Sequence, residues 1–184
     1  MRVNLDKKVS RRRNSLFYAI MLGILFSWSY AHSQTAALDP SFDGDGIKIT
    51  SGMGDGRQVL QQGDGKLIII GMNGGNYAVA RLNLDGTSDN SFDSDGIRYF
   101  DFGGFEYGWT GAIQNDGKIL VLGAPEWGPS FHLLRLNADG SNDNTFDGDG
   151  IVSRNVGISG VGNLRIAIQS DGKILVSYTA SSTN

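Results

Sequence analysis

The residues best suited to chemistry gather in one stretch near the middle of the chain. The only two glutamates of the 184-residue sequence are Glu106 and Glu126, and both stand beside aromatic residues. The candidate binding residues are these two glutamates together with Tyr107, Trp109 and Trp127. Carboxylates next to rigid aromatic rings favour binding of a sugar or a peptide. Glycoside hydrolysis by the glutamate pair is the catalytic alternative and needs carboxylate separations of roughly 5 or 6.5–9.5 Å. The remaining alternative is that these residues pack within their loops and have no binding role.

Three Asp-x-Asp-Gly loops are the candidate metal sites, because paired carboxylates followed by a turning glycine begin many calcium loops. A calcium loop counted from Ser91 would need a glutamate at its twelfth position, where Phe102 stands. Aspartates that hydrogen-bond their own backbone at turns account for the pattern without a metal. We therefore predict turns, with no metal and no cofactor, and keep calcium as the alternative. The six carboxylates belong to Asp43, Asp45, Asp93, Asp95, Asp147 and Asp149.

The sequence offers few groups for catalysis. It contains no cysteine, and His132 is the one histidine beyond residue 33. Zinc sites built on cysteine and histidine, and Cys-His dyads, are therefore excluded from that part of the chain. His132 stands between Phe131 and Leu133, which favours a packed side chain, and no Gly-x-Ser-x-Gly motif is present. We predict no catalytic residue and a protein that is not an enzyme.

The first 33 residues have the layout of a secretory signal peptide. Basic residues are followed by an apolar run over residues 16–26 and then by the small residues Ala31 and Ser33. This run is short against the roughly 20 residues that span a membrane, so we predict cleavage after Ser33, with an uncleaved anchor as the alternative. The protein is then expected outside the cytoplasm, in the periplasm or the extracellular medium, with no membrane attachment after cleavage.

The charge of the remaining chain argues against nucleic acid and anionic membranes as partners. Beyond residue 33 there are ten basic and eighteen acidic residues, a net charge of −8. Neutralising phosphates requires grouped lysines and arginines, which this part of the chain lacks.

The chain beyond the predicted signal peptide repeats itself. The motif Phe-Asp-x-Asp-Gly-Ile recurs at spacings of 50 and 54 residues, starting at Phe42, Phe92 and Phe146. The motif Gln-x-Asp-Gly-Lys recurs in the same phase at spacings of 52 and 55 residues, starting at Gln62, Gln114 and Gln169. Two landmarks at one period indicate a repeat architecture, with units at about 38–87, 88–141 and 142–184.

Each unit reads as four short strands. In the second unit the apolar segments are 97–102, 111–114, 119–123 and 131–137. The candidate binding residues lie in the first-to-second and third-to-fourth connections of this unit, which the up-down strand order is expected to place at the same end of the sheet. Asp-Gly between the second and third segments predicts two-residue type I′ turns with both residues at positive φ. The third segment is wholly apolar, which indicates a strand covered on both faces.

Four antiparallel strands in about fifty residues are typical of a β-propeller blade, and such blades bury their faces only by stacking. The fold class predicted is therefore all-β and propeller-like, with about two and three-quarter blades. The loop that holds Phe92 is expected to carry the chain from one blade to the next, and its ring to fill the gap between them.

These motifs resemble the delta-60 repeat family of bacteria. The family pattern of Leu-Asp-x-[Ser/Thr]-Phe, Gly-x-Asp-Gly, Gln-x-Asp-Gly-Lys and Arg-x-Asn-x-Asp-Gly is similar to segments across residues 38–178. The resemblance implies consecutive propeller blades and no shared catalytic residues. Since closed propellers have 4–8 blades, we expect either missing C-terminal blades or self-association.

The function expected from these observations is that of an exported, non-enzymatic module. It would serve as a structural scaffold or bind a protein or a glycan through its blade-end loops. The alternatives are a propeller enzyme of glycoside hydrolase or lyase type with its site on the rim, and the non-catalytic part of a longer secreted enzyme.

Overall fold

The computed structural model describes residues 37–157 and 160–181, and the predicted signal peptide over 1–33 lies outside them. The chain divides into two units, residues 1–38 and 39–184, and every strand of the described residues belongs to the second unit. The described residues contain no helix that is long and apolar enough to cross a membrane.

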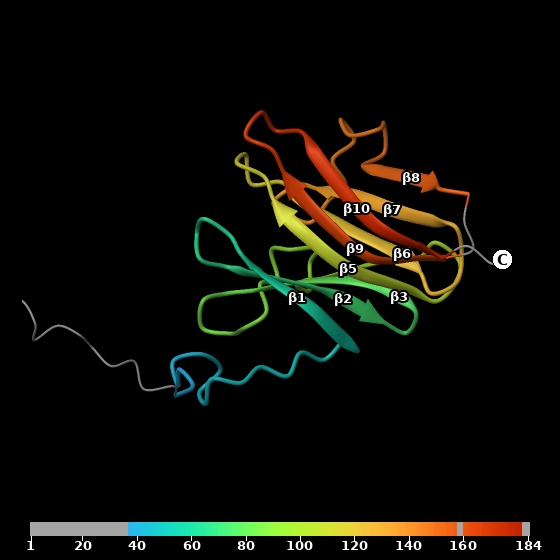
Figure 1. Ribbon diagram of the computed structural model, residues 1–184. Coiled ribbons are helices and arrows are strands. Elements are labelled where there is room, and N and C mark those ends of the chain that lie inside the picture. Colours follow the sequence, from blue (N-terminus) through green and yellow to red (C-terminus); the bar gives the residue numbers. More distant parts are fainter. Residues whose placement is uncertain (1–36, 158–159, 182–184) are drawn as a thin grey trace, which may run out of the picture. The chain divides into compact units, whose positions relative to one another are not determined.

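The described strands form three consecutive antiparallel sheets (Figure 1). The first sheet consists of β1 (Asp55–Gln61), β2 (Leu67–Asn73), β3 (Asn76–Leu82) and β4 (Ile97–Phe100), paired in that order. The second sheet repeats it with β5 (Glu106–Ile113), β6 (Ile119–Pro125), β7 (Ser130–Leu136) and β8 (Ile151–Asn155). A third sheet consists of β9 (Gly160–Ile168) and β10 (Ile174–Ser181). The chain is therefore all-β and propeller-like, and its sheets do not close into a ring within the described residues.

The sheets are out of phase with the sequence units. The segment 97–102, expected as the first strand of the second unit, contains β4, which pairs with β3 and ends the first sheet. The loop that contains Phe92 therefore joins two strands of one sheet, and the chain passes to the next sheet through residues 101–105. The expectation that the Phe92 loop connects two blades is wrong, because backbone pairing is decided by which strand edge is free and not by where the motif recurs.

The Asp-Gly hairpins also differ from the prediction. Gly65 has φ of +89°, but Asp64 does not have a positive φ. The backbone N–H of Gln62 bonds to the carbonyl of Lys66 at 2.8 Å, and Asp64 accepts the Lys66 N–H at 3.1 Å. The connection is a three-residue loop closed by a left-handed glycine, not a two-residue type I′ turn. Aspartate is suited to this loop because its carboxylate binds the free N–H of the following lysine.

The second sheet is covered on both of its faces. Ile119 and Val121 of β6 pack in one cluster with Ile68 and Ile70 of the first sheet. The alternating residues of β6 pack in another cluster, with Val161 and Leu164 of β9 among others. Every residue from Ile119 to Ala124 is buried. This confirms that the apolar third segment of the unit, which forms β6, is covered on both faces. In the third sheet, by contrast, Leu175 of β10 is 51% exposed.

Phe92 lies between the first two sheets, as expected. Its ring is fully buried in the cluster that the two sheets share. It lies over Gly140 of the second sheet, where a Cβ would stand 3.0 Å from the ring, and the N–H of Asp93 bonds to the carbonyl of Asp139 at 3.1 Å. The loop of one sheet thus docks on a turn of the next sheet.

A buried ion pair ties this loop to its own sheet. Asp89 accepts hydrogen bonds from Lys66 Nζ at 2.7 Å and contacts Arg81 Nε at 2.6 Å. Arg81 also donates to the carbonyl of Ala138 in the second sheet. The second sheet repeats the arrangement, with Asp143 between lysine and arginine nitrogens at 2.7 and 2.6 Å.

Acid is expected to destabilise the fold through these two aspartates. Hydrogen bonds from Lys118 and Thr145 hold the pKa of Asp143 well below its usual range. Burial raises the pKa of Asp89, but hydrogen bonds from Lys66 and Ser91 outweigh it, so this pKa is also lowered. A carboxyl whose pKa is lower in the folded than in the unfolded chain stabilises the fold above its unfolded pKa of about 4 and loses that effect as the pH falls further.

Urea denaturation at pH 5 and pH 3 measures this loss. The urea concentration at the midpoint of unfolding should be lower at pH 3 than at pH 5. This difference should be smaller for Asp143→Asn than for the wild type. An equal fall in both proteins would contradict the assignment to Asp143.

Candidate functional site

One hollow at the end of the second sheet is lined by three of the five candidate binding residues, Glu106, Glu126 and Trp127. It has a volume of about 500 Å³. The walls come from the connection 101–105, the first residue of β5, the end of β6 with the turn that follows it, and the start of β7. We call it the rim pocket, and its lining residues are Phe102, Gly103, Gly104, Phe105, Glu106, Pro125, Glu126, Trp127, Ser130 and His132.

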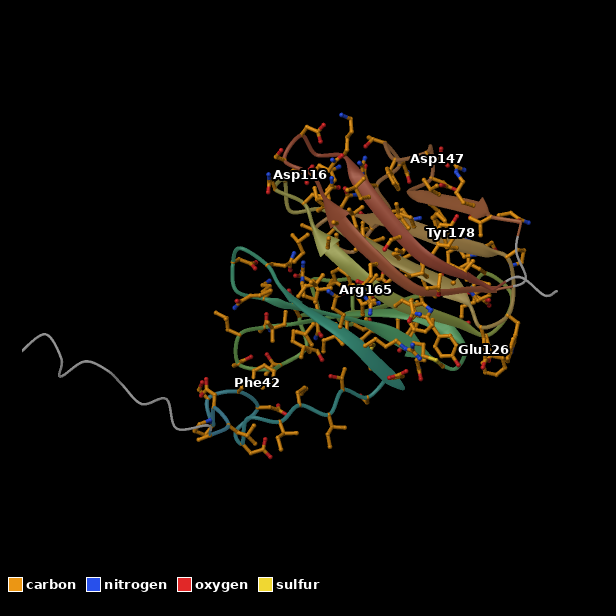
Figure 2. The ribbon with its side chains drawn as sticks, viewed as in Figure 1. Phe42, Asp116, Glu126, Asp147, Arg165 and Tyr178 are labelled. Carbon is orange, nitrogen blue, oxygen red and sulfur yellow. The ribbon has the colours of Figure 1, made fainter. Side chains whose placement is uncertain are left out.

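Backbone hydrogen bonds hold the two loops of the rim pocket together. The N–H of Glu126 bonds to the carbonyl of Phe105 at 2.7 Å, and the N–H of Glu106 bonds to the carbonyl of Gly75 in the first sheet at 2.8 Å. The two loops lie at the same end of the sheet, as their up-down strand order predicts. Figure 2 shows Glu126 at this end and Asp116, in the β5–β6 turn, at the opposite one.

The two glutamates have different surroundings. Glu106 is only 2% exposed, and its Oε2 accepts the backbone N–H of Phe102 at 2.9 Å. Burial raises the pKa of Glu106, with a smaller contribution in the same direction from the charge of Asp101. Glu126 belongs to the exposed turn between β6 and β7. The rim pocket thus has one carboxylate in its wall and one near its mouth.

Aromatic rings form the rest of the pocket. Trp127 is 84% exposed and Phe105 is 63% exposed, so both present apolar faces to solvent. The ring of His132 stacks on that of Phe102 with a centroid distance of 4.1 Å and an interplanar angle of 3°. Tyr77 of the first sheet packs edge-on against Phe102 at 5.3 Å. The inner wall is held in place by these contacts, whereas the outer rings are free to touch a ligand.

His132 is packed, as expected, and it also makes a polar contact that the sequence did not indicate. Its Nδ1 lies 2.8 Å from the hydroxyl oxygen of Ser153 on the neighbouring strand β8. Burial lowers the pKa of His132, which keeps the imidazole neutral at neutral pH. Only the pairing of β7 with β8 brings these two residues together, since they stand 21 positions apart.

Tyr107 and Trp109 do not line the rim pocket. Both lie in β5 and not, as expected, in the connection before the second strand of the unit, and their rings pack edge-to-face at 6.1 Å. The guanidinium of Arg57, on β1, lies 4.5 Å from the centroid of Tyr107 and 4.4 Å from that of Trp109. These two rings therefore join the first and second sheets through a cation–π contact. Because side chains alternate along a strand, Tyr107 lies on the opposite face of β5 from Glu106, and Trp109, at an irregularity of the strand, packs beside Tyr107.

Five of the six carboxylates in the Asp-x-Asp-Gly loops form hydrogen bonds or ion pairs within the protein, Asp147 being the exception among the described contacts. Asp45 and Asp95 each accept the backbone N–H of the isoleucine two positions later, at 2.8 and 2.9 Å. Asp43 and Asp93 pair with Lys48 at 3.0 Å and with Arg98 at 2.7 Å. In the third loop, Asp149 accepts the N–H of Ile151 at 2.8 Å. Within the described ranges, no three His, Asp or Glu side chains come together in a group that could hold a metal ion.

Two segments of the chain match the sequence model of a family described as "Domain of unknown function (DUF5122) beta-propeller". They are residues 62–92 and 114–146, which cover the same part of the first and second sheets, from the hairpin glutamine to the loop phenylalanine. That family is of the delta-60 repeat type, so the resemblance noted in the sequence is supported for these segments. No curated protein and no solved structure matches the chain.

Proposed function

We propose that this chain is an exported, non-enzymatic interaction module that binds a protein or a glycan in the rim pocket. The propeller-like array supplies the rigid support, and the loops at the end of the second sheet supply the contacts. Export is supported by the layout of residues 1–33, which is that of a signal peptide.

One observation carries the proposal most directly. Trp127 and Phe105 hold their rings in solvent at the mouth of a hollow that also contains two carboxylates. Exposing a tryptophan has a cost in solvation, and among the described residues Trp127 makes too little contact to offset that cost, since 84% of it is exposed. Tryptophans beside a concave, partly polar surface are frequent binding hot spots.

Replacing Trp127 by alanine tests the proposal. The wild-type chain is screened on a glycan array and on a peptide array and is expected to bind at least one probe. Trp127→Ala should weaken binding of that probe about 30-fold, the usual loss at a tryptophan hot spot of about 2 kcal/mol. The thermal unfolding temperature should stay unchanged, because the side chain is 84% exposed.

Ile49→Ala is the matched control, since Ile49 is 87% exposed and does not line the rim pocket. It should bind the probe as the wild type does. If the wild type retained no probe on either array, or if Trp127→Ala bound it undiminished, the pocket would not be the binding site.

A rim enzyme is the second candidate, because both glutamates of the chain line one pocket. It would act as a glycoside hydrolase or lyase, and the chain could also be a non-catalytic part of a longer secreted enzyme. Release of nitrophenol from aryl glycosides, abolished in both Glu106→Gln and Glu126→Gln, would favour hydrolysis over binding.

A further inference from the structure

We propose that the rim pocket recognises an organic cation, either an alkylammonium or a guanidinium group. This inference rests on the proposed binding function and names the chemical class of the ligand. The source of the cation is either a lysine or arginine side chain of a partner protein or a free amine.

The first argument is the charge of the pocket. Its lining contains Glu106 and Glu126 but no lysine or arginine. Burial keeps His132 neutral at neutral pH, so this residue does not offset the carboxylates. Anionic groups such as phosphates, sulfates and carboxylates are therefore repelled from the pocket, and cations are attracted to it.

The second argument is that, among the described residues, the two glutamates form no ion pair, whereas many of the aspartates do. In the described part of the chain, every ion pair joins an aspartate to a lysine or an arginine, and neither glutamate takes part in one. Asp89 and Asp143 even have two cationic partners each. The pocket thus holds carboxylates that the fold leaves without a counter-charge.

The third argument is the burial of Glu106. This carboxylate is 98% removed from solvent, and within the described residues the one hydrogen bond that it accepts comes from the N–H of Phe102. A buried charge that is incompletely compensated disfavours the folded state until a partner arrives. A cation entering the pocket would supply that partner, so part of the binding free energy comes from relieving an existing penalty.

The fourth argument is the aromatic surface. Trp127 and Phe105 line the pocket with exposed rings, and the faces of such rings attract cations, tryptophan most strongly. The chain already uses this chemistry nearby, where the guanidinium of Arg57 lies 4.4 Å from the ring centroid of Trp109. Aromatic rings with carboxylates form a site for a cation with an apolar periphery, which fits a methylated ammonium or a lysine side chain.

Isosteric pairs that differ only in charge test the inference. Choline is compared with 3,3-dimethylbutan-1-ol, and acetyl-Gly-Lys-Gly-amide with the same peptide carrying 2-aminoheptanoic acid, in which a methyl group replaces the lysine ammonium. Binding to the full chain is followed by the NMR signal of the Trp127 indole N–H, which Trp127→Phe assigns. The cation of each pair is expected to bind at least tenfold more tightly than its neutral isostere. Tighter binding of choline points to a free amine, and tighter binding of the lysine peptide to a partner protein.

Two variants show whether the glutamates are responsible. Glu126→Gln alters an exposed turn and should keep the fold, while weakening cation binding about tenfold, which corresponds to 1.4 kcal/mol. Glu106→Gln should weaken it at least as much, and it retains an oxygen that can accept the Phe102 N–H. Asp116→Asn, at the far end of the same sheet, is the control and should bind cations as the wild type does.

The outcomes separate the two proposals. Equal binding of a cation and its neutral isostere, or cation binding that survives both glutamate substitutions, would overturn the inference. If no cation binds but an array probe is still lost in Trp127→Ala, the inference fails and the proposed binding function stands. If neither cation nor array probe binds, both fail.

Discussion

Replacing Phe92 by alanine is expected to lower the free energy of unfolding by about 3–5 kcal/mol. The ring is fully buried between the first two sheets and packs in one cluster with Ile68 on one side and Leu136 on the other. Its removal would leave a cavity that neither sheet can fill, because backbone hydrogen bonds fix both of them. Denaturation in urea, followed by tryptophan fluorescence, measures the change.

Phe42→Ala is the matched control for this prediction. Phe42 occupies the same position in its repeat and lies over Gly86, but its side chain is only partly buried. It should therefore lose less than half as much stability as Phe92→Ala. A change below about 1 kcal/mol for Phe92→Ala, or equal changes in the two variants, would show that the ring does not hold the sheets together.

Replacing Asp89 by alanine is expected to lower the free energy of unfolding by a similar amount, about 3–5 kcal/mol. The side chains of Asp89 and Arg81 are 8% and 7% exposed, so the substitution leaves a buried guanidinium without its carboxylate. It also removes the partner of Lys66 and the acceptor of the Ser91 hydroxyl. The same denaturation experiment measures the loss.

Asp93→Ala is the control for the ion pair. Asp93 pairs with Arg98 at 2.7 Å, but the two side chains are 36% and 26% exposed, and such pairs contribute about 1 kcal/mol or less. If Asp93→Ala were as destabilising as Asp89→Ala, charge alone and not burial would explain the effect. Adding Arg81→Met to Asp89→Ala should restore part of the stability, because the orphaned charge is then removed.

The recurrence of two motifs was enough to predict an all-β chain with repeated four-stranded sheets. Gln-x-Asp-Gly-Lys marks a hairpin wherever it occurs, since its aspartate binds the N–H of the lysine in all three copies. The apolar run 119–122 indicated a strand buried on both faces, and the structure has it so. These features are local, or follow from the pattern of side chains along one strand.

The sequence alone could not predict which sheet the segment 97–102 joins. Ile97 follows an aspartate-rich loop and begins an apolar segment, which fits the first strand of a sheet as well as the last one. In the structure this segment pairs with β3 and forms the last strand of the first sheet. A choice between two partners depends on residues far apart in the chain, so no local pattern decides it.

Sequence alone determined the types of residue available at the candidate site and the loops that carry them. It placed Glu106, Glu126 and Trp127 at one end of one sheet, because alternating strand directions bring those loops together. Tertiary structure decided which of the predicted residues share the pocket. Stacking of the first sheet on the second engages Tyr107 and Trp109 with Arg57, and it buries Glu106 while leaving Trp127 in solvent. The reason is that exposure and charge compensation are properties of neighbours in space, and the neighbours here come from different sheets.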